Sequence, residues 1–343
     1  MPLINDYQAV LDTYQEASEL GVGLPVFCAE DRETLEAILA SAVKMGEQIG
    51  VDNLPIIPAW TSRYPSRGQM TLLTACGVPV LGTRMMFSDI ELFSSENSPY
   101  RKLRILPHLD HAFPWLDGDI LDNFADSFAS VMCDASEKPF EENIRLTADY
   151  VERARGRVVV EGAVDEIFES GGEGEKNEPT TVEQAQRFLG ETGVDIIVPN
   201  VGTEHRATAD QIQYRGDRAR EISAAVGKIL CVHGTSSVKP EDLPNLPKDG
   251  FVKINIYTTL AVHGGQAVAK TVLDNLADIF SEKDLMQLVE NGVLGKNAFD
   301  PKGSIRPKLD KVTNPPRRDA WFTAVRDRCC DFLDILNYRS FKQ

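Results

Sequence analysis

Three of the five histidines stand at or just after the ends of short apolar runs that have the composition of buried β-strands. They are His111, His205 and His233. Imidazole nitrogens are common ligands of catalytic zinc, and a site with three protein ligands keeps a fourth position for water or substrate. If the runs are strands of one barrel, their carboxyl ends meet at one mouth. The spacing therefore predicts a catalytic divalent metal site.

An acidic residue directly precedes the first of these histidines. Asp110 could exchange a hydroxyl proton as a general acid or base, or it could only orient a ligating imidazole. Asp134 is interpreted as structural or as a ligand of a secondary metal. His108 is expected to pack in the core, and His263 to lie on the surface. Asp110 is therefore the main candidate for proton transfer.

Eight β-branched runs must position these side chains. Several of them are continuously apolar, as expected of parallel strands that are covered on both faces. The runs are residues 24–29, 54–60, 104–111, 127–134, 157–164, 194–202, 228–234 and 251–258.

Amphipathic helices are predicted between the runs. The clearest are residues 31–50, 139–155, 181–192 and 261–280. Thr181 and Gln184 form a capping-box pattern, and Gly193 follows as a C-terminal stop. Eight strand-then-helix units favour an α/β fold, a (β/α)₈ TIM barrel. Two Rossmann-like halves are the alternative, but no G-x-G-x-x-G opens a helix after a strand.

The chain is expected to divide near residue 280. Residues 1–280 would form the barrel with the metal site, and residues 281–343 a C-terminal helical extension that packs on the barrel or on a partner subunit. A last helix is predicted at 319–338. Residues 61–99 are expected to form a long excursion, and residues 168–179, rich in Gly and Glu, a mobile loop.

The composition excludes several classes of protein. With 36 basic and 52 acidic residues, the net charge of −16 disfavours binding to nucleic acid or to an anionic membrane. No apolar run approaches the length of about 18 residues that a membrane span needs. The first residues lack a secretory signal, so a cytoplasmic location is expected. The six cysteines, without C-x-x-C spacing, are interpreted as buried reduced thiols.

Several short motifs occur between the first histidine and the end of the eighth predicted strand. They are His108-Leu109-Asp110-His111, Ser130-Val131-Met132-Cys133-Asp134-Ala135-Ser136, Phe140-Glu141-Glu142-Asn143, Val160-Glu161, residues 181–195, Gly202-Thr203-Glu204-His205, Val232-His233-Gly234-Thr235-Ser236 and Val252-Lys253-Ile254-Asn255-Ile256. The resemblance that they carry extends over roughly residues 20–280. In order and content they resemble the signatures of the class II, metal-dependent ketose-bisphosphate aldolases.

This resemblance implies a role for each matching residue. His111, His205 and His233 would hold a divalent ion, with Zn²⁺ favoured by imidazole ligands. Asp110 would handle the proton of the C4 hydroxyl, and Asn255 would hold the enediolate. The substrate would be a phosphorylated ketose with a donor half of the dihydroxyacetone phosphate type. The resemblance also implies a homo-oligomer, a dimer or a tetramer.

Phosphate binding is expected at the loops after the seventh and eighth strands, where small residues and hydroxyls allow close backbone approach. The candidates there are Gly234, Thr235, Ser236 and Thr258, and Gly202 at the end of the sixth strand is a further candidate. Arg206 replaces a small residue of the family and is added as a substrate-binding candidate.

Four departures from the family pattern favour an altered substrate. Ala163 replaces a glutamate, the pair Tyr257 and Thr259 replaces the two acids of N-I-D-T-D, and Arg206 replaces a small residue after His205. The fourth departure is that the loop motif G-G-x-E-D becomes Gly-Gly-Glu-Gly-Glu over residues 171–175. The carboxylate that abstracts a proton from the donor carbon is therefore expected to be Glu173 or Glu175, with the rigidly placed Glu161 as the competing candidate.

Three functions are compatible with this sequence. The first is an aldolase for a phosphorylated ketose other than fructose 1,6-bisphosphate. The second is a genuine fructose- or tagatose-bisphosphate aldolase, and the third a catalytically weak paralogue that binds sugar phosphate. A Schiff-base aldolase would need a desolvated, neutral lysine, for which Lys253 is the candidate, but the nearby Asn255 favours the metal mechanism.

Overall fold

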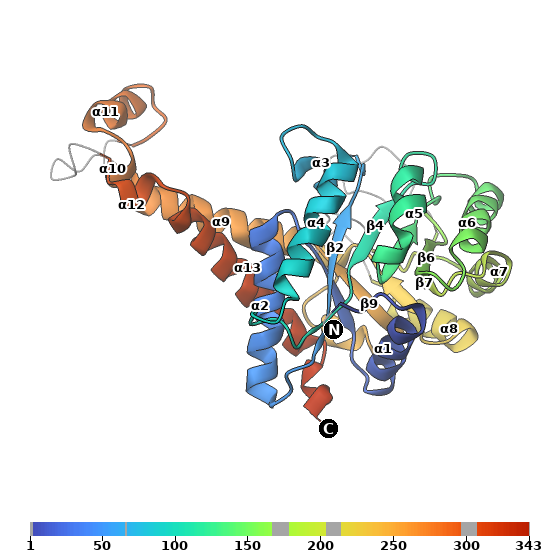
Figure 1. The fold of residues 1–343 in the computed structure, drawn as a ribbon. Coiled ribbons are helices and arrows are strands. Elements are labelled where there is room, and N and C mark those ends of the chain that lie inside the picture. The colour runs from blue at the N-terminus through green and yellow to red at the C-terminus, as the bar shows by residue number, and fades with distance from the viewer. Residues whose placement is uncertain (1–2, 66, 167–177, 204–213, 296–306, 343) are drawn as a thin grey trace.

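The computed structural model describes residues 3–65, 67–166, 178–203, 214–295 and 307–342. Its centre is a closed barrel of eight parallel strands, because β1 pairs with both β2 and β9 (Figure 1). The strands are β1 (Leu24–Cys28), β2 (Pro55–Thr61), β4 (His108–Ala112), β5 (Ser130–Cys133), β6 (Val159–Ala163), β7 (Ile196–Val198), β8 (Leu230–Val232) and β9 (Phe251–Ile256). The predicted (β/α)₈ barrel is confirmed.

The third predicted strand is in fact two strands. Residues 104–111 divide into two strands. The first is β3 (Arg104–Ile105), which pairs with the amino-terminal end of β2, and the second is β4 in the barrel. Pro107 lies between them, and its nitrogen has no hydrogen to donate to a neighbouring strand. The expectation of one continuous strand there is wrong.

Local sequence signals set the limits of several helices. The side chain of Asp31 caps α2 (Arg32–Ile49), which ends at Gly50 in the left-handed conformation. The capping box of Thr181 and Gln184 is present at the start of α7 (Val182–Thr192). The other helices on the barrel include α6 (Phe140–Ala154) and α8 (Gly216–Val226). The helices predicted at 31–50, 139–155 and 181–192 are confirmed within one residue at each end. The helix predicted at 261–280 instead spans Thr258–Asp274, and the last helix, predicted at 319–338, spans Pro315–Ile335.

Some helices were not predicted. The first is α1 (Tyr7–Glu19), which lies across the amino-terminal ends of the strands, where Tyr14 contacts Ser130 of β5. The excursion after β2 contains α3 (Gln69–Leu72) and α4 (Pro79–Phe93), and α5 (Gly118–Phe124) follows β4. Short 3₁₀ helices are Ala125–Ser127, Thr235–Ser237, Leu243–Asn245 and Tyr338–Lys342.

The C-terminal helices form an arm that leaves the barrel (Figure 1). The long helices α9 (Thr258–Asp274) and α13 (Pro315–Ile335) run side by side, and α13 also packs on α2. The remaining helices, at the far end of the arm, are α10 (Leu276–Ile279), α11 (Glu282–Glu290) and α12 (Leu309–Val312). None of the described helices is long and apolar enough to span a membrane. The domain boundary near residue 280 stays a prediction.

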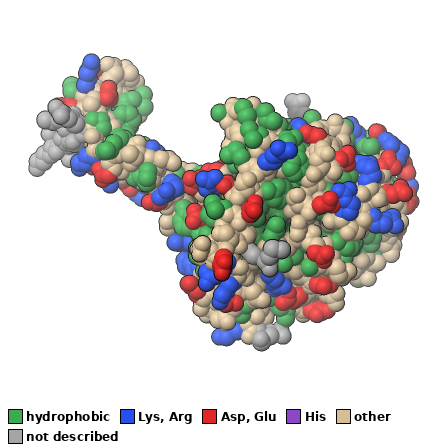
Figure 2. Space-filling model, viewed as in Figure 1, with side chains coloured by type: hydrophobic (Ala, Val, Ile, Leu, Met, Phe, Trp, Pro, Cys, Tyr) green, Lys and Arg blue, Asp and Glu red, His purple; other side chains and the backbone are tan. Residues whose placement is uncertain are grey.

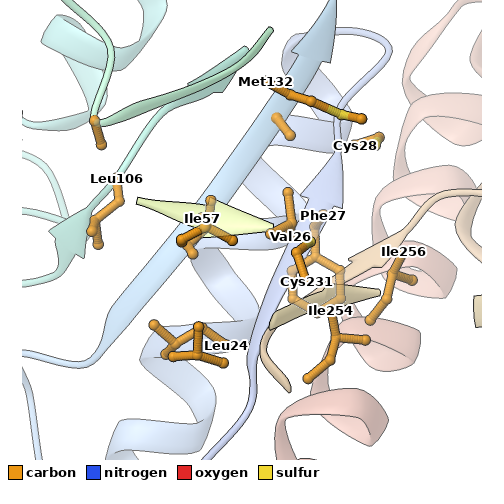
Figure 3. Packing of buried hydrophobic residues seen from close by; sticks show 14 of the residues in the cluster. Leu24, Val26, Phe27, Cys28, Ile57, Leu106, Met132, Cys231, Ile254 and Ile256 are labelled. Carbon is orange, nitrogen blue, oxygen red and sulfur yellow. The ribbon is translucent and has the colours of Figure 1, made fainter. Parts of the chain in front are cut away.

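Alternate residues of the strands face opposite ways. In Figure 3, Phe27, Ile254 and Ile256 lie on the side of their strands that faces the helices, and Phe27 contacts the ring of Phe332 in α13. The intervening positions of β9 point into the barrel and carry Lys253 and Asn255, both buried. The interior of this barrel is therefore partly polar.

The cysteine prediction is confirmed in most positions. The cysteines of the described residues are free thiols, and Cys28, Cys133, Cys231 and Cys329 are buried. Cys330 is half-buried. Cys76 is exposed, so its predicted burial is wrong, because it lies in a turn between α3 and α4 rather than in a strand.

Gly264 allows the close approach of α9 and α13. A Cβ atom there would lie 2.7 Å from the ring of Trp321, whereas a Cβ at the next residue, Gly265, meets nothing within 4 Å. Overpacking of this kind costs about 1–3 kcal/mol, whereas alanine in an open helix position gains up to about 1 kcal/mol. We expect Gly264→Ala to lower the free energy of unfolding in urea, and Gly265→Ala to leave it unchanged or raise it. Equal effects of the two substitutions would contradict this packing.

Candidate active site

The backbone of β4 turns two consecutive side chains into the barrel. Neighbouring residues of a strand normally point to opposite faces, but His111 has a φ of +44°. The register of β4 against β5 also shifts between Leu109 and Ala112. A non-glycine residue in this conformation is strained and often marks a functional site. As a result, the donor atoms of Asp110 and His111 lie together at the carboxyl end of the strands.

Two histidines from opposite sides of the barrel meet at this point. Nε2 of His111 lies 3.1 Å from Nδ1 of His233. Their other nitrogens are held by carboxylates, Asp134 at 2.7 Å from Nδ1 of His111 and Glu161 at 3.2 Å from Nε2 of His233. Carboxylates that bind the outer nitrogen of an imidazole fix the ring of a metal ligand. Asp134 thus has the structural position expected for it.

The inner donor atoms are suitable for one metal ion. Ligand atoms of Asp110, His111 and His233 all lie within 4.8 Å of one another, and all three residues are buried. Two nitrogens of tetrahedral zinc, with bonds of 2.0–2.1 Å, are about 3.3 Å apart. The separation of 3.1 Å between the two imidazoles is close to that value. The third predicted ligand, His205, lies outside the described residues.

The charges at this site favour a cation. Burial disfavours charge on both imidazoles and lowers the pKa of His233. At His111 the neighbouring Asp110 and Asp134 outweigh burial and raise the pKa. The carboxylates therefore create a negative potential where the imidazole nitrogens converge.

Glu161, Cys231 and His233 form a second buried group with donor atoms within 4.8 Å. However, the Lys253 ammonium donates to Glu161 in the same space. Burial opposes the charge of Lys253, but Glu161 outweighs it and raises the pKa of the amine above its ordinary range. An ammonium group beside a divalent ion is unfavourable, so this group is a poorer metal site.

The same ion pair bears on the Schiff-base alternative. A lysine that attacks a carbonyl must be neutral, which usually requires a lowered pKa. Lys253 has a raised pKa and is paired with Glu161.

His108 lies next to Lys253 in the core, with Nδ1 2.8 Å from the hydroxyl of Ser130. Burial, with a further contribution from Lys253, lowers the pKa of His108 to about 3 and keeps it neutral.

Asp110 is held on both of its oxygens. Asn255 donates to Oδ1 over 3.0 Å, and Nη2 of Arg67 lies 3.2 Å from Oδ2. Burial alone would raise the pKa of Asp110, but the charges of His111, His233 and Arg67 outweigh burial and hold that pKa well below its usual range. The carboxylate is therefore an anion at neutral pH, which a group that accepts a proton must be.

A cavity of about 320 Å³ opens over these groups. Of the predicted phosphate-binding residues, Gly234, Thr235, Ser236 and Thr258 line it, and Gly202 does not. The hydroxyl of Thr235 donates to the backbone oxygen of Asn255, so it holds β9 as well. Three other predicted residues, Glu173, Glu175 and Arg206, lie outside the described residues.

Some residues of the cavity were not predicted from the sequence. Arg67 lies in the loop after β2, and Arg328 belongs to α13, so both reach the cavity from outside the strand ends. In the sequence, Tyr257 was noted only because it replaces an acid of the family pattern. The centroid of its ring lies 4.5 Å from the guanidinium carbon of Arg67. Local spacing gave no signal for Arg67, which is one of two arginines in Ser-Arg-Tyr-Pro-Ser-Arg.

The chain is similar to known proteins. A model of the family described as class-II fructose-bisphosphate aldolase matches residues 8–300. The fructose-bisphosphate aldolase of Staphylococcus epidermidis is 24% identical over 305 residues, which are 86% of this chain and 96% of that protein. Two solved structures, both under 25% identical, share the fold.

The first is the fructose-bisphosphate aldolase of Campylobacter jejuni, with a TM-score of 0.74 and 19% identity over 98% of this chain and 95% of that chain. The second is the YdjI aldolase of Escherichia coli K12, with a TM-score of 0.62 and 18% identity over 97% of this chain and 98% of that chain. The family match covers most of this chain, and the barrel agrees with it. The chain therefore belongs to the class-II fructose-bisphosphate aldolase family and is an aldolase-type carbon–carbon lyase.

Proposed function

We propose that this enzyme cleaves a phosphorylated ketose other than fructose 1,6-bisphosphate, with release of dihydroxyacetone phosphate or a close analogue. The observation that carries this proposal is the convergence of Asp110, His111 and His233 beneath an open cavity. The replaced acids at Tyr257 and Thr259, which also line that cavity, support a changed substrate.

The proposed cofactor is a divalent metal ion, most suitably Zn²⁺. Nε2 of His111 and Nδ1 of His233 would hold it together with His205, and Asp134 and Glu161 would keep the two described rings in place. When bound, the ion stabilises negative charge on the oxygens of the donor half.

Asp110 would take the proton of the substrate's C4 hydroxyl. The C3–C4 bond then breaks, and its electron pair stays on the donor half as an enediolate. Asn255 would orient both Asp110 and the enediolate, because its amide donates to Asp110 and the residue lines the cavity. Phosphate would lie near Gly234, which has a φ of +67°, and near the first turn of α9. Gly202 and Arg206 remain candidates.

Two alternatives differ in their chemistry. The first is genuine fructose- or tagatose-bisphosphate cleavage, and the relatives from Staphylococcus epidermidis and Campylobacter jejuni are named as fructose-bisphosphate aldolases. A catalytically weak paralogue would bind sugar phosphate without turnover, but it would have no use for a buried, ionised Asp110 beside the metal ligands. A panel of ketose mono- and bisphosphates, assayed for release of dihydroxyacetone phosphate, separates the three. Fastest cleavage of fructose 1,6-bisphosphate would contradict the altered substrate, and no cleavage would favour the paralogue.

Protonation of the donor carbon needs a second carboxylate. Glu161 is fully buried and bonded to both Lys253 and His233, so its position suits a partner of the metal ligand. We propose Glu173 or Glu175 for the proton transfer. Glu161→Gln is then expected to weaken metal affinity by about 10–100-fold, the usual cost of losing such a partner.

Measurement of proton exchange at the donor carbon of dihydroxyacetone phosphate tests this assignment. When corrected for metal content, exchange should persist in Glu161→Gln and fall in Glu173→Gln or Glu175→Gln. Exchange that disappears only in Glu161→Gln at full metal occupancy would transfer the role to Glu161.

A homo-oligomer, a dimer or a tetramer, is also proposed. Figure 2 shows hydrophobic side chains over α3 and α4 and along the arm. The large exposed apolar residues of these two regions include Leu72, Val78, Leu81, Met85, Leu92, Val262, Leu273, Met286, Val293 and Leu309. Exposed apolar surface of this extent is typical of subunit contacts. Sedimentation at the protomer mass of 37.9 kDa would contradict the proposal. The cytoplasmic location stays a prediction.

A further inference from the structure

Arg67 brings a buried positive charge to the reacting end of the cavity. Its side chain is 9% exposed, and Nη2 lies 3.2 Å from Oδ2 of Asp110. The guanidinium carbon is 4.5 Å from the ring centroid of Tyr257 and 5.3 Å from that of Tyr64. Two aromatic rings and one carboxylate therefore fix the position of this cation.

The guanidinium has donors to spare. Arginine carries five N–H groups, and among the residues that the structure describes, Asp110 is its one hydrogen-bond acceptor. None of the guanidinium nitrogens of Arg67 is both fully buried and without a hydrogen-bond partner. Arg67 also lines the cavity. The remaining N–H groups can therefore reach a molecule bound there.

Tyr257 explains why this charge stays available. It replaces the first acid of the family pattern N-I-D-T-D, and its hydroxyl donates to Glu30 over 2.6 Å, which fixes the ring under Arg67. An aromatic face attracts a cation without neutralising it, whereas a carboxylate at this position would pair with it. The substitution leaves the Arg67 charge for the substrate.

The place of Arg67 also indicates which part of the substrate it meets. Its partner Asp110 is the proposed proton acceptor, so substituents on the carbon that carries the reacting hydroxyl lie beside the guanidinium. A phosphate at the far end of the sugar would be several bonds further away. The planar fork of arginine matches a carboxylate with two parallel hydrogen bonds.

We propose that Arg67 is a specificity-determining residue that binds a carboxylate on the aldehyde half, at or next to the carbon that becomes the aldehyde. This inference rests on the proposed aldolase function. The cleaved aldehyde would then be a short aldehyde acid. During cleavage the hydroxyl proton passes to Asp110, the C–C bond breaks with its electron pair on the donor half, and the carboxylate is unchanged.

The test uses metal-loaded enzyme in the direction of synthesis, with dihydroxyacetone phosphate as donor. The acceptors are glyoxylate, neutral glycolaldehyde and glyceraldehyde 3-phosphate. Arg67→Gln should lower kcat/KM for glyoxylate relative to glycolaldehyde by about 100-fold or more, as expected when a charge-assisted contact is lost. Arg63→Gln is the matched control, because Arg63 pairs with Asp117 and Asp119 away from this cavity. That control should leave the ratio unchanged.

Other outcomes would overturn the inference. Equal loss with all three acceptors would mean that Arg67 only positions Asp110, and selective loss with glyceraldehyde 3-phosphate would mean that the bound anion is a phosphate. Arg67→Lys keeps the charge without the fork and serves if the glutamine variant does not fold; it should lower the same ratio by a smaller factor. An unchanged ratio in either variant would also contradict the proposal.

Failure of the aldolase function itself can be distinguished from failure of this inference. If the wild type adds none of the acceptors to dihydroxyacetone phosphate and cleaves no member of the ketose phosphate panel, the proposed function is wrong. Calorimetric binding of glycolate then decides the role of Arg67. Affinity at least 10-fold weaker in Arg67→Gln than in the wild type and Arg63→Gln, at equal metal content, supports the carboxylate site. Equal affinity in all three proteins overturns it.

Discussion

Asp110→Asn is expected to lower turnover by about 10²–10⁴-fold with bound metal and fold retained, because proton transfer by a placed group contributes about that factor. An amide has nearly the same size as the carboxylate but cannot accept the substrate's proton. Asp110 is buried, and its pKa is held well below its usual range, so the wild-type group is an anion at neutral pH. The measurement is kcat with a saturating ketose phosphate, per bound metal ion.

Asp134→Asn is the comparison for this variant. Asp134 bonds to Nδ1 of His111 and lies behind the ring, so its loss should reduce metal affinity more than turnover per bound ion. Metal loss in Asp110→Asn would instead show that Asp110 is a ligand. Unchanged turnover would remove Asp110 from the mechanism.

His233→Ala is expected to remove the metal. Loss of a residue that only supports a ligand costs about 10–100-fold in affinity, so loss of a ligand should cost at least about 100-fold. The fold should persist, because His233 follows β8 at the mouth and the apolar core lies below it. Elemental analysis of the purified variant gives the metal content, and circular dichroism checks the fold.

His263→Ala is the matched control. His263 is an exposed histidine of α9 that lines the rim of the same cavity. It should keep wild-type metal content. Full occupancy in His233→Ala, or equal loss in both variants, would show that His233 is not a ligand.

The barrel could be predicted because its signals are local. Each strand is a short apolar run, and helix ends such as Asp31 and the Thr181 capping box depend on neighbouring residues. The errors arose where distant contacts decide. Helix α1 is stabilised partly by side-chain contacts of Tyr7 and Tyr14 with other elements, which no pattern in residues 7–19 reveals.

In the site, too, local signals could be predicted and distant contacts could not. The positions of His111 and His233 followed from the strand ends and from the family resemblance. The inward turn of both Asp110 and His111 depends on a φ of +44° in an otherwise extended strand, which spacing does not predict. Arg67 was missed because its role depends on Asp110 and Tyr257, which lie far from it in the sequence.

Metal-dependent release of dihydroxyacetone phosphate is the most direct measurement of the proposed chemistry. The best substrate of the ketose phosphate panel is assayed with the enzyme as purified, after complete removal of metal by a chelator, and after zinc is added back. Release should stop on metal removal and return as zinc approaches one ion per chain, and zinc should not restore it in His233→Ala. Release that continues at full rate in protein shown by elemental analysis to be free of metal would contradict the mechanism.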